Sequence, residues 1–217
     1  GITLNLSVYG TNNEVLNKLR ASQGEGFDVV MPSVTTLVAW YDAGGLLQPI
    51  DESRIPVDNI KPAMWRKSLN LGATYRGERY ALPWNWGTEG FIFNDEERDY
   101  TPGEVSYADL WAAENKDLVS VRPRSALTAM VLLNDGAKML DEAHQDEETA
   151  HKAFGRALEF ALEHKAWIRQ FWKDTPALQS AFLQNGCVVG QSWDGPALTM
   201  WDQTDGRIKY LAPKEGA

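Results

Sequence analysis

The stretch from Tyr80 to Asn94, YALPWNWGTEGFIFN, most restricts what this 217-residue chain can fold into. An apolar run ends at Pro83, two tryptophans and two glycines follow, and FIF forms a short β-rich run. Pro and Gly oppose a helix, so the stretch predicts a strand, an aromatic crossing and a second strand. On an extended backbone Trp84 and Trp86 point to the same side. Aromatic side chains on such a loop suit a cleft for an organic ligand, and core packing beside a turn is the alternative.

Charge and composition exclude several classes of function. The chain carries 30 acidic and 21 basic residues, a formal net charge of −9, and no basic stripe is visible, which argues against a nucleic-acid partner. No apolar run is long enough to cross a bilayer. Hydrophobic residues make up 43% and charged residues 24%, typical of a globular chain with one large domain or two small ones.

Residues that bind metals or cofactors are scarce in this chain. Its one cysteine, Cys187, lies in the run CVVG, which reads as a buried strand, so neither a disulfide nor a cysteine-based metal site is expected. The histidines, His144, His151 and His164, fall in or beside one charged helical stretch and are interpreted as surface residues. We therefore expect no cofactor and no metal.

The first part of the chain alternates predicted strands and helices. Strands are expected over 2–9 and 27–31, and helices over 14–21 and 35–43, the second closed by Gly44-Gly45. Short connections in a β-α-β-α order favour a parallel sheet and the α/β class. A hairpin over 71–82 then leads into the aromatic stretch.

The second part of the chain again predicts strands, loops and helices. The polar run 95–103, broken by Pro102-Gly103, reads as an inter-domain connection. We expect a first α/β lobe over 1–98, a second over 99–208 and a return crossover toward the first lobe over 209–217. Helices are expected over 106–114, 126–140, 149–171, 176–184 and 198–203, and strands over 118–121, 187–192 and 208–211.

Six motifs occur in an order that resembles the bacterial extracellular solute-binding proteins of ABC importers, most of all their spermidine/putrescine-binding branch. They are FDVVMPS, LLQPID, YALPWNWGTEGFIFN, SYADLW, GCVVGQSWDGPA and IKYLAPKEGA. The family's pattern matches 29–33, Pro83, Trp86, Gly87, Asn94, 193–197 and 213–216. The resemblance implies a two-lobed α/β fold of the periplasmic-binding-protein type (type II), whose lobes close over a small solute. The hinges expected for this closure are residues 93–95 and the region after Lys209.

The same resemblance implies a role and a setting. The chain is expected to capture a small-molecule solute in the periplasm and to deliver it, as a monomer in transient contact with an ABC permease, without catalytic activity. The family normally has an additional first strand and helix and a long C-terminal part, for which this chain shows no counterpart. Lobe one is therefore expected to be incomplete, with part of its sheet edge or core exposed.

Nine residues form the expected ligand site. Trp86 and Trp193 would sandwich the solute, and Asp194, together with Glu89, could hold an ammonium group or act as a simple loop cap. Arg122 and Arg124 would neutralise an acidic group. The full set is Ser33, Thr35, Trp84, Trp86, Arg122, Arg124, Ser125, Trp193 and Asp194, in which Ser33 and Thr35 hydrogen-bond the solute from a helix start.

One departure from the family concerns the charge of the solute. Polyamine binders place carboxylates in the loop that opens the long helix of the second lobe. Here the matching loop, residues 121–125, carries two arginines and a serine. Guanidinium groups at a helix N-terminus suit an anion. We therefore expect an anionic or zwitterionic solute, with polyamine binding as the alternative function. The alternative role for Arg122 and Arg124 is that of solvated surface charges without a ligand.

Two alternative functions, an enzyme and a ligand-sensing domain, are compatible with this fold. Thiaminases resemble these binding proteins and use a cysteine nucleophile, but Cys187 lies inside an apolar run without a neighbouring His or Asp, which disfavours an enzyme. A ligand-sensing domain of a larger receptor would bind a solute in the same way without a transporter.

Overall fold

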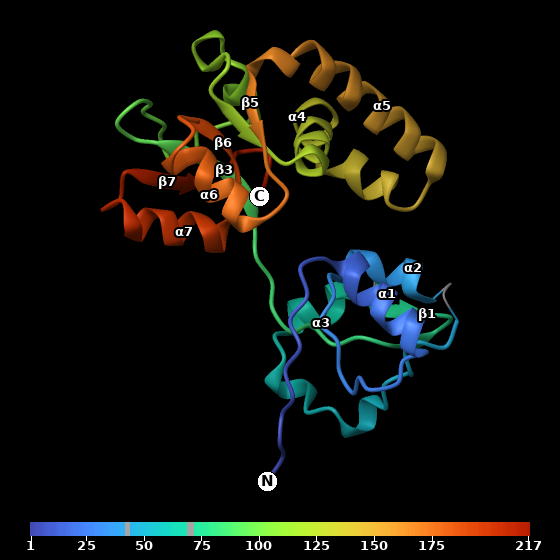
Figure 1. The fold of residues 1–217 in the computed structure, drawn as a ribbon. Helices are drawn as coiled ribbons and strands as arrows, with labels where there is room; N and C mark the ends of the chain where they lie inside the picture. Colours follow the sequence, from blue (N-terminus) through green and yellow to red (C-terminus); the bar gives the residue numbers. More distant parts are fainter. Residues whose placement is uncertain (42–43, 69–71) are drawn as a thin grey trace. The chain divides into compact units, whose positions relative to one another are not determined.

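The computed structural model describes residues 1–41, 44–68 and 72–217, and the chain divides into two compact units (Figure 1). Unit 1 covers residues 1–86 and unit 2 covers residues 87–217. The boundary lies earlier than the one expected at 98/99, because strand β3 (Glu89–Asn94) belongs to the sheet of unit 2. Strand β7 (Ile208–Leu211) pairs with β3 as well, so residues 209–211 extend this sheet instead of forming a return crossover.

Unit 2 is built on a five-stranded mixed sheet with the order β5-β4-β6-β3-β7. β4 (Val119–Val121) runs parallel to β5 (Ile168–Phe171) and to β6 (Val189–Trp193). β3 runs antiparallel to both β6 and β7. The segment 168–171, expected at the end of a long helix, is a strand because it pairs with β4 along the sheet, a contact that a local helix pattern cannot reveal.

Helices cover both faces of this sheet. β3 carries Phe91, Ile92 and Phe93, none more than 1% exposed, and alternation along the strand sends the two phenylalanines to one face and the isoleucine to the other. The phenylalanine face packs with α4 (Pro123–Ala143), α5 (Glu147–Glu163) and a 3₁₀ helix (Tyr107–Trp111). The opposite face packs with α6 (Thr175–Leu183) and α7 (Asp194–Gln203).

Local signals explain where the helices of unit 2 begin. Ser106 forms a capping box with Asp109 at the start of the 3₁₀ helix, and the carboxylates of Asp146 and Asp174 cap α5 and α6. The Glu215 carboxylate of the PKEG motif accepts hydrogen bonds from the Ser106 hydroxyl at 2.5 Å and the Tyr107 backbone N–H at 3.2 Å. The C-terminal motif is therefore tied to the body of unit 2.

Unit 1 has a smaller core. It contains α1 (Asn12–Ser22), α2 (Leu37–Tyr41), α3 (Pro62–Ser68), the hairpin of β1 (Thr74–Tyr75) with β2 (Glu78–Arg79), and short 3₁₀ turns over Val34–Thr36, Glu52–Arg54 and Val57–Asn59. The expected hairpin is confirmed around its turn, but its strands are shorter than expected, over 74–75 and 78–79 only. Residue 71 lies outside the described residues. The hairpin turn places Arg76 and Gly77 at φ of 52° and 86°, as a tight hairpin turn requires. Residues 42–43 of the expected helix over 35–43 also lie outside the described residues.

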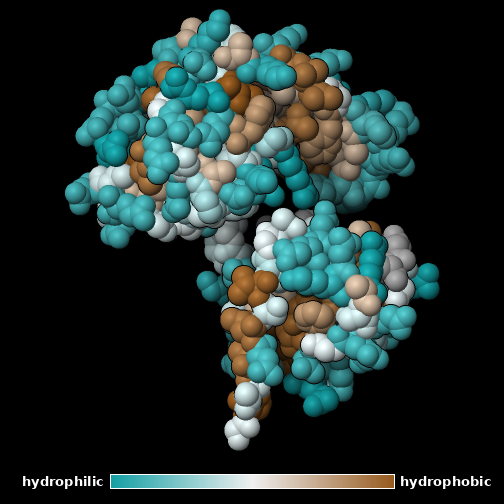
Figure 2. Space-filling view, viewed as in Figure 1, coloured by the Kyte–Doolittle hydropathy of each residue, from teal (hydrophilic) through white to brown (hydrophobic). Residues whose placement is uncertain are grey.

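The two strands expected at the start of unit 1 do not form. Residues 2–9 and 27–31 are irregular. Tyr9, Phe27 and Val30 pack partly buried against the core of unit 1. The other apolar side chains are exposed; these are Ile2, Leu4, Leu6, Val8, Val29 and Met31, at 99%, 80%, 74%, 81%, 80% and 52%. Figure 2 shows hydrophobic atoms gathered along the N-terminal segment. Alternation supplies strand propensity, but a strand also needs a hydrogen-bonded neighbour, and in this structure neither segment has one among the described residues.

Across the described ranges, no helix combines the length and apolar character that a membrane span needs.

Candidate functional site

One edge of the unit 2 sheet gathers charged and aromatic side chains. β4, β5 and β6 are parallel, so their carboxyl ends meet at the same edge, where Arg122 follows β4, Trp172 follows β5 and Trp193 ends β6. β3 runs the other way and begins at this edge with Glu89, the direct cross-strand partner of Trp193. We call Glu89, Arg122, Trp172 and Trp193 the edge cluster. The carboxyl ends of strands are where open α/β sheets bind ligands.

The Glu89 carboxylate links Trp193 and Arg122. The indole N–H of Trp193 donates a hydrogen bond to Glu89 Oε2 at 3.1 Å. Arg122 Nη1 lies 3.8 Å from the same oxygen, and the two side chains are 31% and 21% exposed. The ion pair is therefore partly withdrawn from water while its outer side stays accessible.

Two indole rings lie beside the guanidinium of Arg122. Its Cζ atom is 5.0 Å from the ring centroid of Trp193 and 5.9 Å from that of Trp172. The two rings contact each other edge to face, with centroids 4.8 Å apart and an interplanar angle of 84°. A cation within about 6 Å of an indole face is attracted by the ring quadrupole. The edge cluster thus combines a carboxylate and two indoles around one cationic group.

Burial controls the protonation of Glu89. Desolvation raises the pKa of its carboxyl above the ordinary glutamate value, while the Ser125 hydroxyl, the charge of Arg122 and the Trp193 N–H act in the opposite direction and do not cancel the shift. Glu89 Oε1 is buried and, among the described residues, has no hydrogen-bond partner. Burial therefore disfavours the ionised form of the Glu89 carboxyl, so ionising this group in the folded chain costs stability.

A Glu89→Gln variant is expected to alter how the unfolding free energy depends on pH. Because the folded-state pKa is raised, the stability linked to the protonated carboxyl is fully present below the unfolded pKa and is lost as pH rises through the folded value. The Gln variant lacks this loss, so it should gain stability relative to the unmodified chain as pH rises above the ordinary glutamate pKa of about 4. Urea unfolding across this range measures the difference.

The matched control for this prediction is Glu147→Gln, since the Glu147 side chain is 91% exposed. The stability curves of Glu89→Gln and Glu147→Gln should therefore diverge as pH rises. A Glu89→Gln curve that runs parallel to the unmodified chain would contradict the buried-carboxyl interpretation.

Asp194, an expected ligand residue, is engaged within the chain. Its Oδ2 atom accepts hydrogen bonds from the backbone N–H and hydroxyl of Thr88 at 2.9 and 3.3 Å, and its Oδ1 accepts one from the Gly195 N–H at 2.7 Å. The Tyr210 hydroxyl donates to the Thr88 hydroxyl at 2.8 Å. This geometry favours the loop-cap interpretation, in which Asp194 ties the start of β3 to α7.

The other expected residues of unit 2 lie at the start of α4. Arg122 is the N-cap residue of this helix and makes no side-chain cap hydrogen bond. Arg124 is exposed, whereas Ser125 is half-buried and its carbonyl accepts a hydrogen bond from Gln191 Nε2 at 3.2 Å. Arg122 therefore joins the edge cluster, and Arg124 acts on Glu89 only as a nearby charge.

Four expected residues belong to unit 1. Ser33 is exposed and precedes the 3₁₀ turn Val34–Thr36, without a side-chain cap hydrogen bond. The side chain of Thr35 lies outside the described part of the chain. Trp84 and Trp86 are 79% and 63% exposed. These surfaces are open to a ligand, and their role as ligand residues stays a prediction.

Sequence reasoning left Trp172 and Glu89 out of the expected site. Trp172 directly follows the helix expected over 149–171. The local sequence therefore does not predict that it lies at the end of a parallel strand. Glu89 was noted only as an alternative ammonium partner. The signal that could have found it is its position at the start of the FIF strand, opposite Trp193. Gln191, buried beside them, holds the start of α4 through Ser125.

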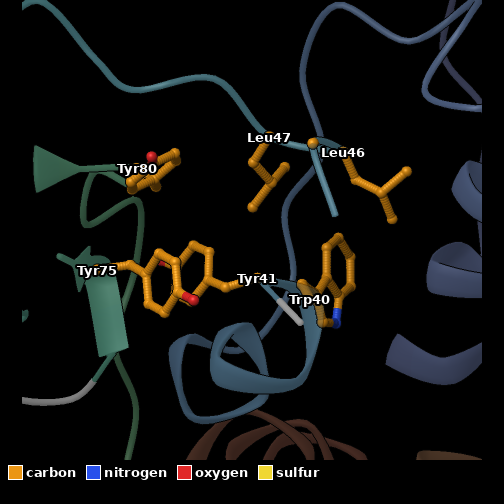
Figure 3. A pocket seen from close by; sticks show the side chains of 7 residues that line it. Trp40, Tyr41, Leu46, Leu47, Tyr75 and Tyr80 are labelled. Atoms are coloured by element: carbon orange, nitrogen blue, oxygen red, sulfur yellow. The ribbon is translucent and has the colours of Figure 1, made fainter. Parts of the chain in front are cut away.

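A pocket in unit 1 is lined by aromatic rings (Figure 3). Tyr41 and Tyr75 stack with centroids 4.6 Å apart and an interplanar angle of 13°, and Tyr80 tilts against both. The Tyr41 hydroxyl donates to the Gly72 carbonyl at 2.7 Å. Desolvation, with a smaller effect of Tyr80, raises the pKa of Tyr41. The described residues that line the pocket carry no charged group, so it reads as packing between α2 and the hairpin.

Comparison with known proteins assigns the chain to a family. A model of the bacterial extracellular solute-binding protein family matches residues 1–217, and the chain belongs to this family. It is similar to spermidine/putrescine-binding periplasmic protein 1 of Haemophilus influenzae, with 29% identity over all of this chain and 56% of the relative. It is also similar to the putrescine-binding periplasmic protein PotF of Escherichia coli, with 32% identity over all of this chain and 60% of the relative.

Solved structures agree on the fold. The spermidine/putrescine substrate-binding protein PotD of Streptococcus pneumoniae matches with a TM-score of 0.70 and 22% identity, over 95% of this chain and 59% of that one. The Tp0655 lipoprotein of Treponema pallidum matches with a TM-score of 0.68 and 17% identity, over 96% and 61%. The expected α/β fold of the periplasmic-binding-protein type is therefore confirmed. The chain spans somewhat more than half the length of these relatives.

Proposed function

We propose that this chain acts as the solute-binding component of a bacterial ABC importer. It binds a small organic solute that carries an acidic group, and delivers it to a membrane permease from the periplasmic side. Family membership and the names of the relatives support the transport role and the location. The observation that best supports an acidic solute is the half-buried guanidinium of Arg122 at the edge where the parallel strands end.

Arg122 and the start of α4 suit an acidic group together. The helix has 21 residues, its first position is Pro123, and its N-cap side chain leaves the first N–H groups uncapped. Free N–H groups and the positive end of the helix dipole attract an anion, and Arg can bind a carboxylate through two parallel hydrogen bonds. A zwitterionic solute is compatible with this site when its ammonium group lies outside the edge cluster, because the Glu89 charge is already paired with Arg122.

Polyamine binding is the second candidate function. The names of the relatives favour it, and so does the presence of Glu89 among the indoles of Trp172 and Trp193. Against it, the charge of Glu89 is already paired with Arg122. A dication entering the edge cluster would meet a resident cation, and like charges in a partly buried site repel.

The enzyme alternative needs a reactive cysteine. Burial raises the pKa of the Cys187 thiol to about 11, so the thiol is protonated at neutral pH. This protonation state does not favour a cysteine nucleophile.

The proposal also includes that the chain captures its solute as a monomer and contacts the permease transiently. The alternative on the same fold is a ligand-sensing domain.

A ligand screen by thermal unfolding and calorimetry tests the proposed function. Acidic and zwitterionic solutes should raise the unfolding temperature, and Arg122→Ala should weaken their binding by roughly 10- to 100-fold, since a charge-assisted hydrogen bond contributes about 1.5–3 kcal/mol. Arg124→Ala removes the same charge from an exposed position and should change the affinity little. Stabilisation by putrescine and spermidine alone would replace this proposal with the polyamine candidate.

A further inference from the structure

We infer that the guanidinium of Arg122 occupies an organic-cation site of the protein itself and thereby excludes alkylammonium solutes; this inference rests on the proposed function. The site is made of the Glu89 carboxylate and the indoles of Trp172 and Trp193. Its resident guanidinium would be replaced by a solute cation if the arginine were removed.

The groups around Arg122 form a recognisable cation site. The guanidinium carbon lies 5.0 Å and 5.9 Å from two indole centroids, within the range of a cation–π interaction. A carboxylate oxygen lies 3.8 Å from Nη1. Aromatic faces together with an anion are the combination that recognises an organic ammonium or guanidinium ligand.

The site is held in place without Arg122. Glu89 and Trp193 are cross-strand partners in the β3–β6 ladder and share a hydrogen bond of 3.1 Å between their side chains. Trp172 is 1% exposed, and its backbone N–H donates to the Val121 carbonyl at 3.1 Å. The three groups that surround the guanidinium therefore belong to the sheet, and truncating the arginine leaves them in position.

Charge balance gives the vacated site an affinity for cations. The Glu89 side chain is only 21% exposed, and a partly buried carboxylate without a counter-charge is unfavourable. In the unmodified chain Arg122 supplies that charge. When it is absent, the carboxyl either takes up a proton or pairs with a cation from solution that fits between the indoles, and a higher pH favours the bound cation.

The decisive variant is Arg122→Ser, because residue 122 is the N-cap of α4 with an extended backbone (φ −89°, ψ 127°), where serine is a preferred residue. The probes are methylguanidinium and putrescine, measured by calorimetry on the full chain. We expect at least a tenfold gain in affinity for both over the unmodified protein. Arg122→Lys, which keeps a cationic side chain of similar length, should show no gain.

Two further variants distinguish binding at this site from an effect of the overall change in net charge. Arg124→Ser makes the same charge change at an exposed neighbour and should show no gain. Adding Glu89→Gln to Arg122→Ser should remove the gain, since the carboxylate that attracts the probe is lost. Arg122→Gln provides a second neutral replacement should the serine variant fold poorly.

The outcomes are distinct. A folded Arg122→Ser or Arg122→Gln protein without gain overturns the inference, as does an equal gain in Arg124→Ser. The proposed function is judged separately, by binding of acidic solutes to the unmodified chain. If that binding is absent while Arg122→Ser gains the probes, the inference stands and the acidic-solute proposal fails.

Discussion

Gly190→Ala is expected to lower the unfolding free energy of unit 2 by roughly 3 kcal/mol, near the upper end of the usual cost of overpacking. A Cβ atom at this position would lie 2.1 Å from the Ser120 carbonyl oxygen and 3.1 Å from Phe182 Cζ. The first of these atoms belongs to the backbone of the parallel neighbour β4, so it can move only if the β4–β6 pairing shifts.

The same substitution should also impair solute binding. β4 leads directly into Arg122 and β6 ends at Trp193, so a displacement between these strands separates two members of the edge cluster. Urea unfolding followed by circular dichroism, and calorimetry with a solute identified in the screen, measure the two effects.

Gly155→Ala is the matched control for Gly190→Ala. Gly155 lies within α5, and a Cβ atom there meets nothing within 4 Å. Alanine should therefore raise stability by about 0.5–1 kcal/mol through helix propensity. If the Gly190→Ala variant proved as stable as the unmodified chain, this would contradict the close approach of the β4 and β6 backbones at Gly190.

The second large effect is expected in unit 1, where Arg79→Met should lower stability by about 2–4 kcal/mol. The Arg79 side chain is 1% exposed, and its guanidinium carbon lies 3.5 Å from the ring centroid of Trp65. Its nitrogens donate to the Ser68 hydroxyl and to Glu52 Oε1, each at 3.1 Å, and to the carbonyls of Trp65 and Ala81 at 3.4 Å. Methionine retains the apolar stem and loses all of these interactions.

Glu52→Gln serves as the control, because the Glu52 side chain is 50% exposed and a partly solvated ion pair contributes little, about 1 kcal/mol or less. Thermal and urea unfolding of both variants compare the buried hydrogen bonds of Arg79 with its ion pair. Equal losses in the two variants would assign the stabilisation to the ion pair and contradict the role of the buried contacts.

Several elements could be predicted because their signals are local. The FIF run predicts β3, and the apolar run after Asn185-Gly186 predicts β6. Ser106 with Asp109 predicts a capped helix start, which the structure realises as a 3₁₀ helix over Tyr107–Trp111 instead of a helix over 106–114. Each depends on residues a few positions apart, whose steric and hydrogen-bonding preferences act in any context. The motif order also led to the family and, through the loop 121–125, to Arg122.

Other elements could not be predicted because they depend on distant partners. Residues 168–171 form β5 through pairing with β4, across a gap that contains α4 and α5. Residues 2–9 have the alternation of a strand and remain irregular, since alternation does not provide a neighbour. The unit boundary at 86/87 follows from the pairing of β3 with β6 and β7, strands far ahead in the chain.

The candidate site shows the same division. Residue types and motifs determined that an arginine loop opens a long helix and that a tryptophan ends an apolar strand. Only the tertiary structure decided that Glu89, Arg122, Trp172 and Trp193 meet at one edge and that Asp194 binds Thr88 instead of standing free. The physical reason is that local sequence sets backbone preference and chemical type, whereas strand order and direction set which side chains become neighbours.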